Sequence, residues 1–310
     1  MDILTHGLVG ALVGRAVAPR AAWPALAAVV GGALVPDLDV VARLWDPLAP
    51  ITVHRTATHS LLGGLPLALA VGGLCRVLGP AMSVHGLAAL AYAGVLSHIG
   101  LDLLTPFGTG VLWPWDGRRF GLGWLYVIDP VVIGVALAAL LITAGRLRAA
   151  RPIAVGALGA LTGYVFVAGL VMGWAEQDFL RLLHSERVAA TRTVLVPTFP
   201  GPFRWLGVAE TDDAVYRARF FVGRRPEEPL AVFPRPSPEP PPASEEAPVV
   251  RAFRGFARVP WGAIEADGDA RTLVYRDLAF EDHPFGGEMA LRIHLDRSGT
   301  VRAVRLGHTF

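Results

Sequence analysis

The sequence predicts a mainly α-helical membrane bundle of four to six apolar helices, followed by a small β-rich C-terminal domain. Only 17% of the 310 residues are charged, against about 25% in an average soluble domain, and the mean hydropathy is +0.47. The apolar residues are concentrated before about residue 180, and short alternating runs follow them. We therefore expect a membrane domain over residues 1–188 and a polar domain over 189–310.

Six apolar segments make up the helical part. A full membrane span needs about 20 residues at 1.5 Å rise each, and the last four segments satisfy this length. The first two are shorter and predict a partly inserted hairpin or two tilted helices. Glycines within the segments permit close helix packing in lipid. The segments are Ile3–Ala18, Ala21–Val35, Ser60–Leu78, Val84–Leu104, Tyr126–Ala144 and Pro152–Trp174.

The polar half starts with a helical extension over Glu176–Arg187 and continues as strands. Alternation of apolar and polar residues is typical of half-buried strands, and it is strict over Leu291–Leu295. A proline-rich loop at about 225–248 interrupts the strands, and we interpret it as a surface loop rather than a recognition segment. The expected strands are Thr193–Val196, Ala214–Phe221, Val249–Phe256, Arg271–Tyr275, Ala290–Leu295 and Thr300–Leu306.

Composition excludes several kinds of site. Every basic residue is an arginine, the arginines are scattered, and the net charge is only +2, so we expect no nucleic-acid partner. The single cysteine, Cys75, excludes an internal disulfide and a cysteine-based zinc site. The chain starts without a basic leader, so we do not expect the first apolar segment to be a cleaved signal peptide.

Arginines in the loops indicate how the helices are oriented. If the loops after the first, third and fifth segments are cytoplasmic, the positive-inside rule places the other helix ends on the extracytoplasmic side. Four arginines on that opposite side count against this orientation. The loop arginines are Arg15, Arg20, Arg76, Arg146, Arg148 and Arg151, and those on the opposite side are Arg43, Arg55, Arg118 and Arg119.

Histidines and aspartates gather at the helix ends on that opposite side. His98 and Asp102 are four residues apart, so both side chains lie on one helical face. They can share a cation, or Asp102 can orient His98. Ionisable groups at membrane depth are costly and are by default functional. Asp37 and Asp39 follow Pro36, and an extended stretch there would direct both carboxylates one way; two solvated acids after a helix are the alternative.

The third long segment is preceded by His54 and His59, with Thr56 or Thr58 as its expected helix cap. Arg55 lies between them and could neutralise an anionic substrate oxygen, or it could anchor lipid headgroups. His6 is either a ligand or a solvated terminal side chain. Asp129 precedes Pro130, where helix capping competes with ligation.

Together these residues predict a metal site. Histidine and carboxylate ligands without cysteine suit a divalent ion, most simply Zn²⁺, with Mn²⁺ or Mg²⁺ as alternatives. Eight ligands exceed one tetrahedral shell and suggest one or two ions. We expect Arg55, His59 and Asp102 to be catalytic. The expected metal ligands are His6, Asp37, Asp39, His54, His59, His98, Asp102 and Asp129.

The ordered motifs resemble those of the bacterial YdjM-like family of inner-membrane-associated, LexA-regulated proteins, which are regarded as metal-dependent hydrolases. The resemblance covers about residues 1–175 and implies a multi-pass membrane hydrolase whose histidines and aspartates bind metal; it implies no particular substrate. The matching residues are Asp2, Thr5 and His6; Asp37 and Asp39; His54, Arg55, Thr58, His59 and Ser60; Ser97, His98, Asp102 and Thr105; Thr105–Gly108; and Asp129 with Pro130.

These features favour a membrane-bound hydrolase that uses metal-activated water. Its expected partners are the lipid bilayer and an amphiphilic or phosphorylated small molecule, such as a phosphoester or lipid-linked substrate. Two alternatives come from other classes. A divalent-cation transporter would need polar groups through the membrane, whereas the centres of these segments are apolar. A membrane anchor with a structural metal would need a closed ligand shell.

Overall fold

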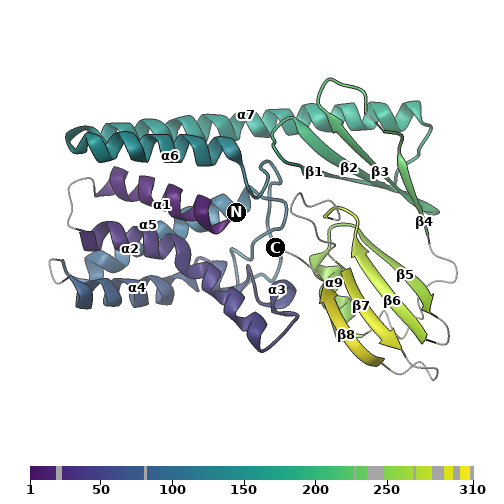
Figure 1. Ribbon diagram of the computed structural model, residues 1–310, viewed down its shortest axis with the longest axis horizontal. Helices are drawn as coiled ribbons and strands as arrows, with labels where there is room; N and C mark the ends of the chain where they lie inside the picture. Colours follow the sequence, from purple (N-terminus) through teal and green to yellow (C-terminus); the bar gives the residue numbers. More distant parts are fainter. Residues whose placement is uncertain are drawn as a thin grey trace. The chain divides into compact units, whose positions relative to one another are not determined.

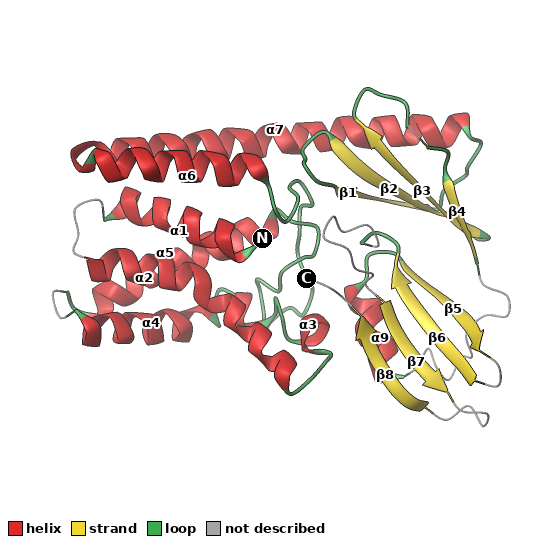
Figure 2. Cartoon of the chain, in the orientation of Figure 1, coloured by secondary structure: helices red, strands yellow, loops and turns green. Residues whose placement is uncertain are grey.

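The computed structural model describes residues 1–18, 23–79, 82–226, 228–235, 247–267, 270–280, 290–295 and 301–307. It confirms the predicted class, because apolar helices form the N-terminal part and two antiparallel sheets follow (Figures 1 and 2). The predicted division at residue 188 stays a prediction. The chain forms two compact units: unit 1 consists of Met1–Ala42, Val53–Val171 and Phe199–Pro202, and unit 2 of Arg43–Thr52, Met172–Thr198 and Phe203–Phe310.

The helices of full membrane length are partly different from those that the sequence predicts. Among the described residues, three are long and apolar enough: Trp23–Leu44, Val84–Leu103 and Leu147–Ser185. The first of these is longer than the short second segment that the sequence predicts. A bent pair, Ala49–His59 with Gly64–Leu78, makes a fourth if it counts as one span. The sequence predicts that the third and fifth segments are each long enough to span the membrane. The helices at these positions, α4 and α6, are shorter, with 15 and 16 residues. The helices are α1 (Ile3–Val17), α2 (Trp23–Leu34), η1 (Val35–Leu44), α3 (Ala49–Thr52), η2 (Ala57–His59), α4 (Gly64–Leu78), α5 (Val84–Leu103), α6 (Pro130–Gly145), η3 (Leu147–Ala149) and α7 (Ala150–Ser185).

Two glycines bring α2 and α5 into backbone contact. A Cβ atom on Gly32 would lie 1.9 Å from the Ala91 carbonyl oxygen, and one on Gly94 would lie 2.0 Å from the Val29 carbonyl oxygen. Small residues allow this approach in a membrane bundle. The contact places the end of α2 beside the last turns of α5, and both ends carry predicted ligands.

The start of α4 differs from the prediction. The helix begins at Gly64, after the 3₁₀ turn η2, and Gly63 at its N-cap makes no side-chain capping bond. The Thr58 hydroxyl instead donates to Asp39 at 2.6 Å, and Thr56 donates to the Val53 carbonyl. Neither threonine caps α4, because both hydroxyls are used in the segment before it.

The connection between α5 and α6 is irregular but well anchored in unit 1. Leu122 N donates to Leu103 O at 2.7 Å, and Trp124 N donates to Leu104 O at 2.9 Å. A single antiparallel bridge pairs Thr109 with Phe120. This loop therefore returns to the end of α5, where His98 and Asp102 lie.

Unit 2 contains two four-stranded antiparallel sheets, each in sequential strand order. In the first, Gly207 provides the space for Phe179, whose ring would lie 2.5 Å from a Cβ atom there. Three strands, β2, β4 and β5, were not predicted, and β4 lies within the expected proline-rich loop. Residues 227 and 236–246 of that loop lie outside the described residues. The strands are β1 (Arg192–Pro197), β2 (Arg204–Glu210), β3 (Ala214–Phe221), β4 (Ala231–Pro234), β5 (Pro260–Asp267), β6 (Ala270–Asp277), β7 (Ala290–Leu295) and β8 (Val301–Gly307).

The predicted strand over Val249–Phe256 is wrong, because this segment is the helix α9 (Pro248–Phe256). Pro248 occupies the first turn, where its missing N–H costs nothing. Val250 and Phe253 are three residues apart and both are buried, which is helical spacing. The alternation of apolar and polar residues in this segment is typical of a strand, so the helical spacing of the two buried residues could not be recognised from the sequence.

Candidate metal centre

Two fully buried side chains on α5, His98 and Asp102, form the base of the site. His98 Nδ1 lies 2.8 Å from the Ala33 carbonyl oxygen. A carbonyl can only accept, so Nδ1 carries the proton and the lone pair lies on Nε2. Among the described residues, neither His98 Nε2 nor Asp102 Oδ2 has a hydrogen-bond partner, although the two atoms lie 3.5 Å apart.

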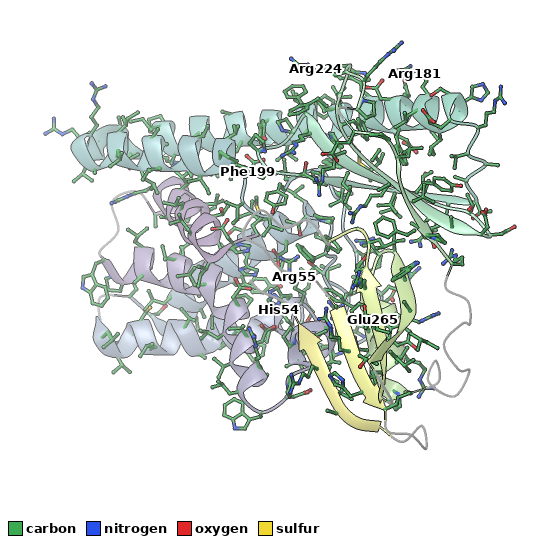
Figure 3. The ribbon with its side chains drawn as sticks, turned by 45° about the vertical axis from the view of Figure 1, so that its right-hand side comes forward. His54, Arg55, Arg181, Phe199, Arg224 and Glu265 are labelled. Carbon is green, nitrogen blue, oxygen red and sulfur yellow. The ribbon has the colours of Figure 1, made fainter. Side chains whose placement is uncertain are left out.

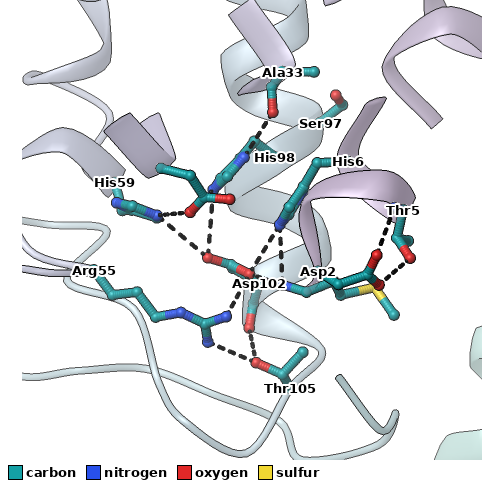
Figure 4. Close-up of polar contacts among 12 residues, drawn as sticks. Asp2, Thr5, His6, Ala33, Arg55, His59, Ser97, His98, Asp102 and Thr105 are labelled. Carbon is teal, nitrogen blue, oxygen red and sulfur yellow. Dashed lines mark hydrogen bonds and ion pairs between the residues drawn. The ribbon is translucent and has the colours of Figure 1, made fainter. Parts of the chain in front are cut away.

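Asp37 from η1 and His59 from η2 complete a set of four, which we call the ligand cluster. His59 Nε2 lies 3.2 Å from Asp37 Oδ1 and 3.6 Å from Asp102 Oδ2. His98 Nε2 lies 3.5 Å from Asp37 Oδ1. Two nitrogens and two oxygens from three separate segments therefore converge, and Figure 4 shows three of these side chains, His59, His98 and Asp102, directed toward one another.

These separations fit a divalent ion. Zinc bonds of 2.0–2.2 Å in a tetrahedron place neighbouring ligand atoms about 3.3–3.6 Å apart, and the four nitrogen–oxygen separations in the cluster are 3.2–3.6 Å. Among the described residues, His98 forms one close group with Asp37 and His59 and another with His6 and Asp102. Burial of a polar atom without a partner costs about 1–3 kcal/mol. An ion among the four atoms would give His98 Nε2 and Asp102 Oδ2 the partner that the described residues do not provide.

Asp39 and His54 lie behind His59 rather than within the ligand cluster. His54 Nδ1 is 2.7 Å from Asp39 Oδ1, and the other Asp39 oxygen accepts from Thr58. His59 Nδ1 is 2.9 Å from Thr58 Oγ1 and 3.4 Å from Asp39 Oδ2. Carboxylates commonly orient metal-binding histidines in this way. Atoms of Asp39, His54 and His59 are also close enough to hold an ion of their own.

The prediction of an extended stretch at Pro36 is wrong, since Asp37 and Asp39 belong to the 3₁₀ helix η1. Three residues per turn and a rise of about 2.0 Å direct the two side chains to different sides. Asp37 consequently contacts His59 Nε2, while Asp39 contacts His54 and the Nδ1 side of His59.

Arg55 is buried and bonded to the cluster. It donates from Nη2 to Asp102 Oδ1 and from Nη1 to Thr105 Oγ1, both at 2.9 Å, and its guanidinium lies over the Phe107 ring at 5.3 Å. Its φ of 61° is uncommon for a residue other than glycine. Such strained residues are frequent at functional sites. Figure 3 labels Arg55 beside His54.

His6 lies on the inner side of the cluster. Its ring stacks on His98 with 3.6 Å between centroids, and its Nε2 lies 3.3 Å from Asp102 Oδ1. The Met1 amino nitrogen is 3.0 Å from His6 Nε2 and also contacts Asp102. His6, His98 and Asp102 offer atoms close enough for a further ion, so the structure brings His6 to the site.

The structure does not bring Asp129 to this site. Its Oδ1 accepts from Val131 N and Val132 N at the start of α6, and its Oδ2 accepts from the Tyr164 hydroxyl at 2.8 Å. Both carboxylate oxygens of Asp129 already accept hydrogen bonds, so we interpret Asp129 as a helix cap rather than a metal ligand. Asp129 is also absent from every described group of side chains that could hold a metal.

Arg118 and Arg119 differ in their surroundings. The Arg118 side chain is 79% exposed and pairs with Asp116 at 2.7 Å. Arg119 is half-buried, and burial together with the charge of Arg55 lowers its pKa from 12.5 to about 10, while Asp39 opposes this shift. The charged groups that shift the pKa of Arg119, Arg55 and Asp39, are therefore residues of the site.

Sequence reasoning missed several of these supporting contacts. The Ala33 carbonyl that orients His98 is a backbone group and left no sequence signal. Thr58 was interpreted as a helix cap. Thr105 was noted only as part of a motif, although it accepts from Arg55 and donates to Asp102 O at 2.8 Å. A threonine three residues after a buried acid is compatible with such a contact but does not predict it.

Comparisons with known proteins support the interpretation of the N-terminal helices as a membrane domain. Residues 1–175 match the YdjM inner membrane protein family. The chain is 22% identical to the uncharacterized protein YfhP of Bacillus subtilis (strain 168), over all of this chain and 96% of that protein. It is 32% identical to the inner membrane protein YbcI of Escherichia coli (strain K12), over 39% of this chain and 72% of that protein. No solved structure matches the chain.

Proposed function

Since the chain belongs to the YdjM inner membrane protein family, we propose that it is a membrane-bound, metal-dependent hydrolase. The observation that carries the proposal is the pair of buried atoms, His98 Nε2 and Asp102 Oδ2, that face each other without a hydrogen-bond partner among the described residues. Asp37 and His59 complete the set that would hold a divalent ion, most simply Zn²⁺, with Mn²⁺ or Mg²⁺ as alternatives.

The residues in and around the ligand cluster would have distinct tasks in such a reaction. A bound divalent ion would supply a Lewis acid and an acidified water at neutral pH. Asp39 and Thr58 hold the His59 ring with Nε2 toward the cluster. Arg55 neutralises Asp102 Oδ1 and leaves Oδ2 as the ligand atom. Asp37 is the one cluster member with an exposed fraction above zero, 17%, so substrate and water would approach from its side.

We propose a phosphoester or lipid-linked substrate at the bilayer surface. The loop between α5 and α6, which returns to the site, carries the exposed side chains of Trp113 and Trp115, and tryptophans are enriched at membrane–water interfaces. The positive-inside argument puts this side outside the cytoplasm. Labelling of a cysteine introduced at Leu112 with a membrane-impermeant maleimide would test the orientation: labelling of intact cells supports it, and labelling only after lysis contradicts it.

The hydrolase proposal is tested by metal analysis and activity on the same samples. Purified wild-type protein, a chelated sample and the His59→Ala/Asp102→Ala variant would be assayed with bis(p-nitrophenyl) phosphate and a short-chain phospholipid. We expect metal and hydrolysis in the wild type and loss of both in the variant, while Asp129→Asn keeps both. Unchanged metal stoichiometry in the double variant would contradict the shared site.

A structural metal site in a membrane anchor is the second candidate, because four protein atoms could close the ligand shell of an ion. The two functions differ in solvent access to the ion. Water-proton relaxation of the Mn²⁺-loaded protein separates them: a fast-exchanging bound water supports the hydrolase, and its absence together with no hydrolysis supports the anchor.

A further inference from the structure

We propose that Arg55 and Arg119 form a phosphoryl-binding subsite beside the ligand cluster, and that the substrate is a phosphorylated lipid. This inference deepens the proposed hydrolase function and rests on it, since it names the substrate class and a residue that selects it. Three observations carry it: the charge of the site, the placement of the two arginines beside one loop segment, and apolar side chains exposed next to a ligand.

The first observation is the charge of the site. Its carboxylates are Asp37, Asp39 and Asp102, and its guanidiniums are Arg55 and Arg119. With neutral histidines these groups leave one negative charge, which a divalent ion turns into a positive surplus. A partly buried site with excess positive charge attracts an anion.

The second observation is that both arginines adjoin the same short loop segment. Gly108 has a φ of +78°, and a Cβ atom there would lie 3.0 Å from Cβ of Arg119. Gly110, two residues later, donates its N–H to the Arg55 carbonyl oxygen at 2.8 Å. The two glycines thus hold the Arg55 and Arg119 backbones on either side of Thr109, the one residue between them.

The charge of Arg55 acts on the half-buried Arg119 and lowers its pKa, and an anion bound by both guanidiniums would offset this repulsion. Arginine suits that task, because its guanidinium presents five N–H donors that match a phosphate. The hydrogen bonds from Arg55 to Thr105 and Asp102 use two of its five. Arg118, the neighbour of Arg119, is spent on Asp116 at the surface and provides a matched control.

The third observation favours a lipid over a soluble phosphoester. Leu38 and Val40 flank the aspartates of η1 and are 61% and 55% exposed, and Val41 is also exposed. The segment that supplies the ligand Asp37 therefore presents an apolar surface within the same turns. Because η1 belongs to Trp23–Leu44, which is long and apolar enough to span a membrane, these side chains would lie against lipid. A phosphorylated lipid could then place its headgroup at the arginines while its chain stays along η1.

The test measures binding of two probes to metal-loaded protein in detergent, by titration calorimetry. The probes are inorganic phosphate and dihexanoyl phosphatidic acid, with uncharged dihexanoylglycerol as the lipid control. Arg119→Gln should weaken both phosphorylated probes about ten- to hundredfold, the loss expected for a charged hydrogen bond. Arg119→Lys should recover part of the loss, and Arg118→Gln should stay within about twofold of wild type. Phosphatidic acid should bind more tightly than phosphate.

Each outcome decides a separate point. Wild-type affinity in a metal-loaded Arg119→Gln variant overturns the subsite, and equal affinity for phosphate and phosphatidic acid overturns the lipid part. If Arg119→Gln does not fold, the binding data of the wild type test the proposal instead. A wild type that binds phosphatidic acid no more tightly than dihexanoylglycerol overturns the proposal. Metal content is measured in every sample. A wild type that binds no metal contradicts the proposed function, whereas full metal without phosphate binding contradicts only the subsite.

Discussion

Asp102 in the helical region and Asp277 in the sheet region are both completely buried, and the two regions satisfy these carboxylates in opposite ways. Asp277, at the end of β6, accepts from three backbone N–H groups: Val259 and Ala279 on Oδ1, and Arg258 on Oδ2. Asp102, on α5, receives Arg55 on Oδ1, and its Oδ2 has no hydrogen-bond partner among the described residues.

This difference separates a structural carboxylate from a candidate ligand. Backbone donors satisfy Asp277 fully and fix the connection between α9 and β5. Asp102 lies among side chains that are themselves potential ligands, His6, His59 and His98. Burial alone therefore does not mark a site. An incompletely satisfied oxygen that faces other ligand atoms does, and the predictions below test this distinction.

The largest effect is expected for Asp102→Asn. The amide keeps the volume but loses the negative charge and the ligand oxygen, so metal affinity should fall more than about a hundredfold, beyond the range seen for residues that only support a ligand. Competition with a fluorescent zinc chelator measures this. Asp277→Asn is the matched control and should keep wild-type affinity; an equal loss in both would erase the distinction.

A smaller loss is expected for Asp39→Asn, because Asp39 orients His59 without joining the ligand cluster. Supporting carboxylates of this kind change metal affinity about ten- to hundredfold. The same chelator competition applies. A loss as large as that of Asp102→Asn would make Asp39 a ligand, and wild-type affinity would show that Thr58 alone orients His59.

Asp277→Ala should destabilise unit 2 and leave the metal untouched. It would leave the N–H groups of Arg258, Val259 and Ala279 without their acceptor, at about 1–3 kcal/mol for a buried unsatisfied donor. Hydrogen exchange at these three amides measures the local loss. Unchanged exchange, or a fall in metal affinity, would contradict the structural role of Asp277.

Asp129→Ala should cost about 1 kcal/mol, the usual value of a helix N-cap, because Asp129 caps α6 and accepts from Tyr164. Hydrogen exchange at Val131 and Val132 should rise, and metal affinity should change less than twofold. A clear loss of metal would restore Asp129 as a ligand and contradict the capping account.

The smallest effect is a pH dependence of unit 2. Burial raises the pKa of Asp277 above its usual value of 3.8, against the opposing backbone hydrogen bonds. The folded state therefore holds this proton more tightly than the unfolded state, so the contribution of Asp277 to stability falls as pH rises from about 4 through the folded pKa. The difference in stability between wild type and Asp277→Asn, measured against pH, should show this slope; the opposite slope contradicts it.

The sequence predicted which side chains lie close together better than it predicted how they are arranged. His98 and Asp102 could be paired from helical spacing alone, because the period of an α-helix is fixed. The orientation of His98 could not, because it depends on the Ala33 carbonyl, which only the close contact of Gly32 and Gly94 brings near. The role of Asp129 could not be decided from its neighbours in the sequence, because an aspartate before a proline is equally suited to cap a helix and to bind a metal.

The segments predicted wrongly share a physical cause. Extended and 3₁₀ backbones allow similar residues after Pro36, and only contacts with His54 and His59 distinguish the two carboxylates. In α9, two buried residues, Val250 and Phe253, define the helical face. The residues around them alternate between apolar and polar types, as in a strand. Short segments contain too few apolar positions to fix their period.

The central claim is that His59, His98, Asp37 and Asp102 bind one ion together. X-ray absorption at the zinc edge of the metal-loaded, full-length protein tests it most directly. The account predicts a shell of about four nitrogen or oxygen atoms at 2.0–2.2 Å, with the multiple scattering of two imidazoles, reduced to one in His98→Ala. A shell without imidazole scattering, or one unchanged in His98→Ala, would contradict it.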